Sequence, residues 1–85
     1  MAFLHTDPFY AALIEAVADE CDAPATSISP HGTVADVPGW DSLRHIRIMM
    51  NLETRLGRKV DVRATYAAED FEALRNLFLV AGGPP

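Results

Sequence analysis

The chain has 85 residues and a formal net charge of −5, with seven Lys and Arg against twelve Asp and Glu. This length allows one small domain with a thin core, which excludes a large scaffold built around a deep catalytic cavity. The acidic balance argues against nucleic acid as a partner because phosphate contacts need Lys and Arg, and no apolar run approaches the roughly 20 residues that span a bilayer.

The first predicted element is a helix over residues 8–21. Asp7 is a suitable N-cap, and Pro8 suits the first helical position. Apolar residues recur at about every fourth position, which is typical of the buried face of a helix. These residues are Phe9, Leu13, Val17 and Cys21. Cys21 is the only cysteine, which excludes a disulfide framework and a cysteine zinc site, and we expect it to be a small buried apolar residue.

Residues 22–40 are predicted to form a long loop. Three prolines and two glycines break any helix there. A connection of this length without structure of its own is unusual inside a compact domain. We therefore expect Ile28 and Val34 to anchor the loop in the core.

A second helix is predicted over residues 41–57. Asp41 and Ser42 are both good capping residues for its start, and Gly57 is an expected C-terminal stop. Its apolar residues lie on two sides. One side can face the core and consists of Ile48, Met49, Leu52 and Leu56, and the other consists of Leu43, Ile46 and Met50. A helix that is apolar on two sides is either deeply buried or keeps one side for a partner.

The remaining residues are predicted to form a short helical turn at about residues 62–68, a last helix over residues 70–80 and a tail over residues 81–85. Asp70 can cap the last helix. The apolar stripe of this helix consists of Phe71, Leu74, Leu77 and Phe78, with Val80 as an optional member. Because no convincing strand pattern is present, the expected class is all-α.

Charge is unevenly distributed along the chain. Residues 1–41 carry seven acids and no Lys or Arg, whereas residues 42–60 carry five basic residues against one acid. Residues 61–85 carry four acids and two arginines. Either the basic stretch packs beside the acidic one, or it stays free to meet a partner, and patterning alone leaves both uses open.

Conventional catalytic motifs are absent from the sequence. It has no glycine-rich phosphate loop, no His-Glu-x-x-His and no Cys-x-x-Cys, and its three histidines are scattered, so no metal site is expected. Ser42 and His45 are three positions apart on a helix and can form a hydrolase pair. However, Asp41 adjoins Ser42 instead of backing His45, and no oxyanion hole is evident. We therefore predict that the chain is not an enzyme, with a small hydrolase as the weakest alternative.

The stretch from Val37 to Gly57 resembles the attachment region of acyl and peptidyl carrier proteins. That family shows Gly-x-Asp-Ser-Leu and then a helix ending in Leu-Glu-x-x-Phe/Leu-Gly. The matching residues here are Gly39, Trp40, Asp41, Ser42 and Leu43, followed by Leu52, Glu53, Leu56 and Gly57. The resemblance covers nearly the whole chain, and it implies one carrier domain over residues 1–85. The implied fold is a small four-helix bundle with three main helices, a short third helix and a long loop between the first two.

The resemblance implies that Ser42 accepts 4′-phosphopantetheine from coenzyme A through a phosphopantetheinyl transferase. The arm then holds an acyl, aminoacyl or peptidyl group as a thioester, which loading enzymes supply and synthase or transferase enzymes use. Gly39, Trp40 and Leu43 flank this site, and the residue matching Asp41 helps to place the serine and a metal ion in the transferase complex. We expect a monomeric protein without a membrane partner. We also expect it in the cytoplasm, because the first residues lack the basic region of a signal peptide.

The resemblance also gives the second apolar side of helix 41–57 a use, as a face on which partner enzymes dock. Its predicted members are Leu43, Arg44, Ile46, Arg47 and Met50, although Ile46 and Met50 can equally be core residues. Carriers of fatty-acid synthesis usually have an acidic helix here. Arg44 and Arg47 therefore favour a specialised pathway, such as polyketide or nonribosomal peptide synthesis, whose enzymes have a less basic docking patch. The alternative is a protein-interaction module that keeps the carrier fold without the arm.

Overall fold

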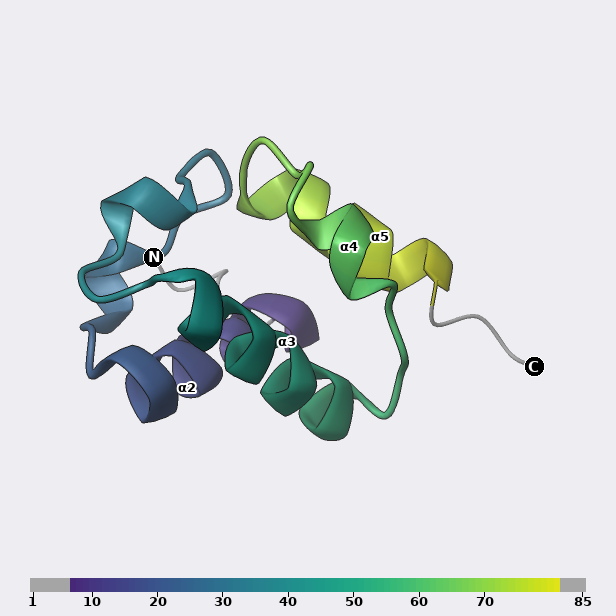
Figure 1. The fold of residues 1–85 in the computed structure, drawn as a ribbon, viewed down its shortest axis with the longest axis horizontal. Coiled ribbons are helices and arrows are strands. Elements are labelled where there is room, and N and C mark those ends of the chain that lie inside the picture. The colour runs from purple at the N-terminus through teal and green to yellow at the C-terminus, as the bar shows by residue number, and fades with distance from the viewer. Residues whose placement is uncertain (1–6, 82–85) are drawn as a thin grey trace.

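The structure, a computed structural model, describes residues 7–81. Its α-helices follow in the order α2 (Pro8–Cys21), α3 (Ser42–Leu56), α4 (Val62–Thr65) and α5 (Phe71–Ala81), as labelled in Figure 1. Two short 3₁₀ turns, η1 (Ala25–Ser27) and η2 (Val34–Asp36), lie between α2 and α3. The described residues contain no strand, which confirms the all-α class, and none of their helices is long and apolar enough to cross a membrane. Of the predicted tail, Ala81 belongs to α5 and residues 82–85 lie outside the described part.

Each helix begins directly after an aspartate. The carboxylate of that aspartate accepts a hydrogen bond from a backbone N–H two or three residues further on, at 2.8–3.0 Å, and so pairs a donor that the helix leaves free. These N-caps are Asp7, Asp41, Asp61 and Asp70. Gly57 ends α3 with a φ of 67°, a conformation that favours glycine. Because Asp41 and Gly57 are caps, α3 is one residue shorter at each end than predicted.

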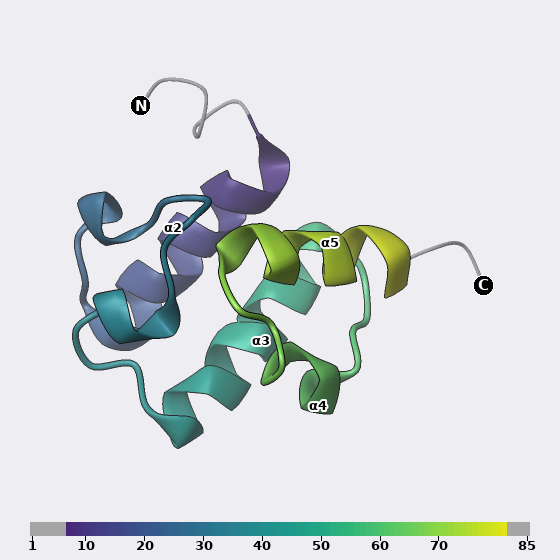
Figure 2. The ribbon, with the colours of Figure 1, turned by 90° about the horizontal axis from the view of Figure 1, so that it is seen from above.

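The helices enclose a single apolar core. α2 and α3 pack along each other, and α5 lies across α3 in the view of Figure 2. The largest fully buried side chains are Leu13 and Val17 of α2, Ile48, Met49 and Leu52 of α3, and Phe71 and Phe78 of α5. The rings of Phe9 and Phe78 lie 5.6 Å apart and join α2 to α5. The predicted stripes are thereby confirmed, except that Cys21, Leu56 and Leu77 are half-buried and Val80 is exposed.

The connection between α2 and α3 reaches the core through Ile28, as predicted, and through Val37. The prediction that Val34 is an anchor is wrong, because this residue is 43% exposed. Thr33 and Asp36 form a capping box that fixes the start of η2. This turn lies at the surface, and Val34 is its first residue. The chain turns inward only after η2, where Val37 has an extended backbone.

The same connection is more ordered than a plain loop. It contains η1 and η2, and its Pro30 and Gly32 carbonyls accept hydrogen bonds from the N–H groups of Glu72 and Phe71 at 2.9 and 3.0 Å. The first turn of α5 is thereby tied to the loop. Cys21, predicted to be buried, is half-buried against the core, and this burial raises the pKa of its thiol.

Candidate functional site

Ser42 is the first residue of α3 and is exposed. The segment before it makes a tight turn, in which the Trp40 N–H donates to the Val37 carbonyl at 3.3 Å and Gly39 has a φ of 83°. Pro38 in the second position and a glycine of positive φ in the third are typical of a type II turn. The buried Val37 and this turn therefore determine where the chain leaves the loop and begins α3.

Asp41 lies beside Ser42 and caps the helix. Its Oδ1 accepts from the Arg44 N–H at 2.8 Å, and its Oδ2 pairs with the Arg44 guanidinium at 3.1 Å. The hydrogen bond from the Arg44 backbone, helped by the guanidinium charge, holds the pKa of the Asp41 carboxyl below its usual value. An ionised carboxylate therefore adjoins Ser42 at neutral pH.

The start of α3 suits an anionic group on the Ser42 hydroxyl. The free N–H groups and the dipole at a helix N-terminus stabilise a negative charge by roughly 0.3–1 kcal/mol at an exposed position. Because Ser42 is exposed, such a group needs no cavity to receive it. Within residues 7–81, no cluster of three or more His, Cys, Asp or Glu could hold a metal ion.

His45 follows Ser42 by one turn but lies on the buried side of α3, where it is 5% exposed. The Trp40 Nε1–H donates to the His45 Nδ1 at 3.2 Å, so the His45 Nε2 carries the hydrogen and donates to the Thr65 Oγ1 at 2.7 Å. Burial lowers the pKa of His45, which favours the neutral ring. Both ring nitrogens are therefore occupied, and His45 is not free to serve as the base that the hydrolase alternative needs.

This hydrogen-bonded group is not among the features predicted from the sequence. One signal for it exists, because His45 shares the buried side of α3 with Ile48, Met49 and Leu52. A histidine on a buried apolar stripe needs polar partners for its nitrogens. Which residue supplies the partner for Nε2 depends on how α4 packs against α3, since Thr65 is 20 positions away.

The predicted second side of α3 is open to solvent. Leu43, Ile46 and Met50 are each between 42% and 62% exposed, which rules out a core role for Ile46 and Met50. Tyr66, the residue that follows α4, is also exposed, and its ring stacks on His45 with centroids 4.1 Å apart. Leu43, Ile46 and Met50 therefore present large apolar side chains to the solvent on one side of α3.

Two basic residues of α3 face the acidic helix α2. The Arg55 guanidinium donates to the carboxylates of Glu15 and Asp19, the latter at 2.6 Å. The Arg44 Nε donates to the Glu20 carbonyl at 2.9 Å. For these arginines, the structure therefore favours packing beside the acidic stretch over a free basic surface.

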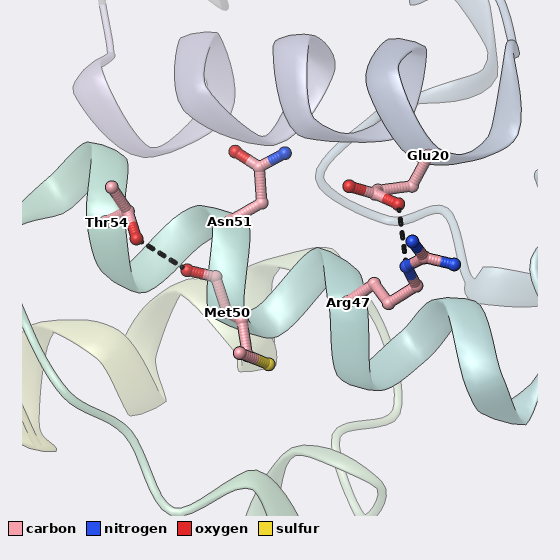
Figure 3. Close-up of a pocket in the computed structure, with 5 residues that line it drawn as sticks. All are labelled: Glu20, Arg47, Met50, Asn51 and Thr54. Carbon is pink, nitrogen blue, oxygen red and sulfur yellow. Dashed lines mark hydrogen bonds and ion pairs between the residues drawn. The ribbon is translucent and has the colours of Figure 1, made fainter.

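Arg47 is more open than Arg44 and Arg55. It pairs with the Glu20 carboxylate at 3.4 Å, yet its side chain is 62% exposed. Figure 3 shows this pair at a hollow of about 440 Å³, with the Met50 side chain pointing away from α2. The other lining residues of the hollow are Asn51 and Thr54.

Comparison with known proteins identifies a family. The family model described as "Phosphopantetheine attachment site" matches residues 11–78, which include the segment from Gly39 to Leu43. No curated protein and no solved structure matches the chain. Members of the family carry covalently attached 4′-phosphopantetheine.

Proposed function

The chain belongs to the phosphopantetheine attachment site family, and on this premise we propose that Ser42 is the attachment residue. As a member, the chain is a carrier domain with 4′-phosphopantetheine as its cofactor. When bound, this cofactor supplies a thiol that can hold an acyl, aminoacyl or peptidyl group as a thioester. The observation that carries the proposal is the exposed Ser42 at the start of α3, beside the capping residue Asp41.

The residues around Ser42 fit a phosphodiester at this position. The helix N-terminus stabilises its negative charge, and the exposed hydroxyl is within reach of a large enzyme. Arg44 holds the Asp41 carboxylate at the helix start, so that charge keeps a fixed place beside the serine. His45, one turn after Ser42, is held by Trp40 and Thr65 and is not free to act as a base. We assign the chemistry of attachment to a phosphopantetheinyl transferase.

Intact mass after incubation with coenzyme A and a broad-specificity phosphopantetheinyl transferase tests the proposal. The wild-type chain is expected to gain one phosphopantetheinyl group, and Ser42→Ala is expected to gain none. Ser29→Ala removes another exposed hydroxyl and is expected to react like the wild type. If the wild type gains no phosphopantetheinyl mass, the alternative of an interaction module without the arm is favoured. If Ser42→Ala is modified, the attachment residue is not Ser42.

We further propose that partner enzymes dock on the exposed side of α3. The apolar members Leu43, Ile46 and Met50 support this because they are large and open to solvent. Arg47 is the more exposed of the two predicted arginines, whereas Arg44 is held by Asp41 and by the Glu20 carbonyl. A basic group beside an apolar face suits a less basic or acidic docking patch, as expected for a specialised biosynthetic pathway. The monomeric state and the cytoplasmic location stay predictions.

Arg47→Glu is expected to weaken loading by the pathway's own loading enzyme several-fold, because it places a negative charge toward the partner's patch. The free energy of unfolding is expected to change by less than about 1 kcal/mol, because an exposed ion pair contributes little to folding. Loading is measured as the KM for this chain, and stability by thermal unfolding. Arg63→Glu on α4 is the matched control, and an equal effect from it would show that net charge, not the position of Arg47, decides docking.

A further inference from the structure

Trp40, His45 and Thr65 come from three parts of the fold and are joined by hydrogen bonds. The Trp40 Nε1 lies 3.2 Å from the His45 Nδ1, and the His45 Nε2 lies 2.7 Å from the Thr65 Oγ1. The Thr65 hydroxyl in turn donates to the Val62 carbonyl within α4. The bonds therefore run from the turn before Ser42, through α3, to the backbone of α4.

The direction of these bonds allows one protonation state of the imidazole. An indole N–H can only donate, so the His45 Nδ1 has to accept from Trp40. The Thr65 hydroxyl gives its hydrogen to Val62 and therefore accepts from the Nε2–H of His45. A second proton on Nδ1 would face the indole N–H and break that bond.

Aromatic rings pack on this hydrogen-bonded group, in which the His45–Thr65 bond is buried and the Trp40–His45 bond is partly buried. Tyr66 stacks on His45 with centroids 4.1 Å apart, and Phe71 packs on Trp40 with centroids 5.8 Å apart. His45 and Thr65 are both buried. Any displacement of the imidazole would leave a donor or acceptor without a partner, so the bonds hold the indole in one place.

We propose that His45 is a positioning residue for Ser42. It acts through Trp40, since the bond to the indole fixes the turn that presents the Ser42 hydroxyl to a phosphopantetheinyl transferase. Trp40 and Ser42 stand on either side of Asp41, and a shift of the indole therefore displaces the start of α3. The proposal rests on Ser42 being the attachment residue.

The surroundings of His45 determine how it responds to pH. The titratable and charged groups near it are the N-cap Asp41, Arg44 of α3, Tyr66 after α4, and Glu69 and Asp70, of which the last two line a cavity of about 80 Å³ together with His45. To this cavity η2 and α5 contribute uncharged residues. Burial lowers the pKa of His45 below its ordinary value of 6.5. The stability contributed by the neutral ring is therefore complete above that pH and is lost as the pH falls through the lower folded pKa.

The single tryptophan of the chain makes a direct spectroscopic test possible. Wild-type Trp40 emission is expected to change in one step below pH 6.5, before helix content is lost, as His45 takes up a proton and releases the indole. His45→Phe keeps a buried ring without its nitrogens and is expected to lack the step. Constant wild-type emission down to acid unfolding, or a step retained by His45→Phe, would overturn the proposal.

Attachment kinetics test the effect on Ser42 with variants of Thr65. Thr65→Val removes the acceptor for the His45 Nε2–H, and it is expected to raise the KM of a broad-specificity phosphopantetheinyl transferase about fivefold at unchanged kcat, because the competent orientation of Ser42 is less populated. Thr65→Ser keeps the hydroxyl and is expected to restore the wild-type KM. The two variants are compared at neutral pH, with helix content measured by circular dichroism as a check on folding.

The outcomes separate this proposal from the assignment of Ser42. If Thr65→Val lowers stability but leaves the KM unchanged, the bonded group is only structural and the positioning role is refuted, while Ser42 stays the attachment residue. If the wild type is not modified at all, the assignment of Ser42 fails and the positioning role falls with it. A raised KM for Thr65→Val with recovery in Thr65→Ser supports both.

Discussion

Phe71→Ala is expected to lower the free energy of unfolding by about 3–5 kcal/mol, because truncation of a buried phenylalanine loses apolar contact and leaves a cavity. The ring is 1% exposed and packs against Trp40, and the Phe71 N–H is bonded to the Gly32 carbonyl of the long connection. Phe71 therefore joins α5, the connection and the turn before Ser42. A small domain has about 5–15 kcal/mol of stability in all, so this one change removes a large share of it.

Leu79→Ala is the matched control for Phe71→Ala, since Leu79 belongs to the same helix but is 49% exposed. Its expected cost is within about 0.5 kcal/mol, as for other surface substitutions. Urea unfolding of both variants is followed by circular dichroism. Fluorescence is less suitable, because the loss of Phe71 would itself change the emission of Trp40. Equal losses from the two variants would show that α5 does not pack on the core through Phe71.

The helix bounds are largely predictable from the sequence because helix ends are formed by local interactions. Asp7, Asp41 and Asp70 bond to N–H groups at most three residues away, and Gly57 ends α3 through its own backbone conformation. Interactions of this range depend only on neighbouring residues. Accordingly, the predicted bounds of α2, α3 and α5 agree with the structure to within one residue, whereas α4 ends earlier than predicted, at Thr65.

Contacts between distant residues follow from the packing of the helices, which periodicity does not encode. Arg55 meets Glu15 and Asp19, which are 40 and 36 positions away, and His45 meets Thr65 across 20 positions. From the sequence alone, the basic stretch can therefore either pack beside the acidic one or meet a partner. The spacing also suggests a pair of His45 with Ser42, whereas His45 bonds to Trp40 and Thr65. Only the angle between α2 and α3 and the place of α4 decide these contacts.

The candidate site also combines local features, which the sequence predicts, with contacts between distant residues, which it does not. Gly39, Asp41 and Ser42 lie within four consecutive residues, so the turn, the cap and the first helical residue can be predicted from the sequence. Arg44 makes one local and one distant contact. It pairs with Asp41 three positions away and donates to the Glu20 carbonyl 24 positions away. That second contact makes Arg44 part of the α2–α3 packing and leaves Arg47 as the better candidate for docking.

Asp41→Asn is expected to slow modification of Ser42 by about 10–100-fold, the usual cost of losing a carboxylate that supports a metal-dependent site. The resemblance to carrier proteins gives the residue at this position a role in placing the serine and a metal ion in the transferase complex. The charge is available for that role, because the bond from the Arg44 backbone keeps the pKa of the carboxyl low. Asparagine caps a helix about as well as aspartate, so the stability of α3 is expected to be nearly unchanged.

Two further variants separate the charge of Asp41 from its cap. Asp41→Ala removes both, and it is expected to lose modification and also to lower the thermal unfolding midpoint, because the Arg44 N–H loses its acceptor. Asp36→Asn alters another exposed capping carboxylate, in η2, and is expected to be modified at the wild-type rate. Rates come from the time course of intact mass. If Asp41→Asn is modified as fast as the wild type while Asp41→Ala is slow, Asp41 serves Ser42 through helix geometry alone, and the transferase has no need of its charge.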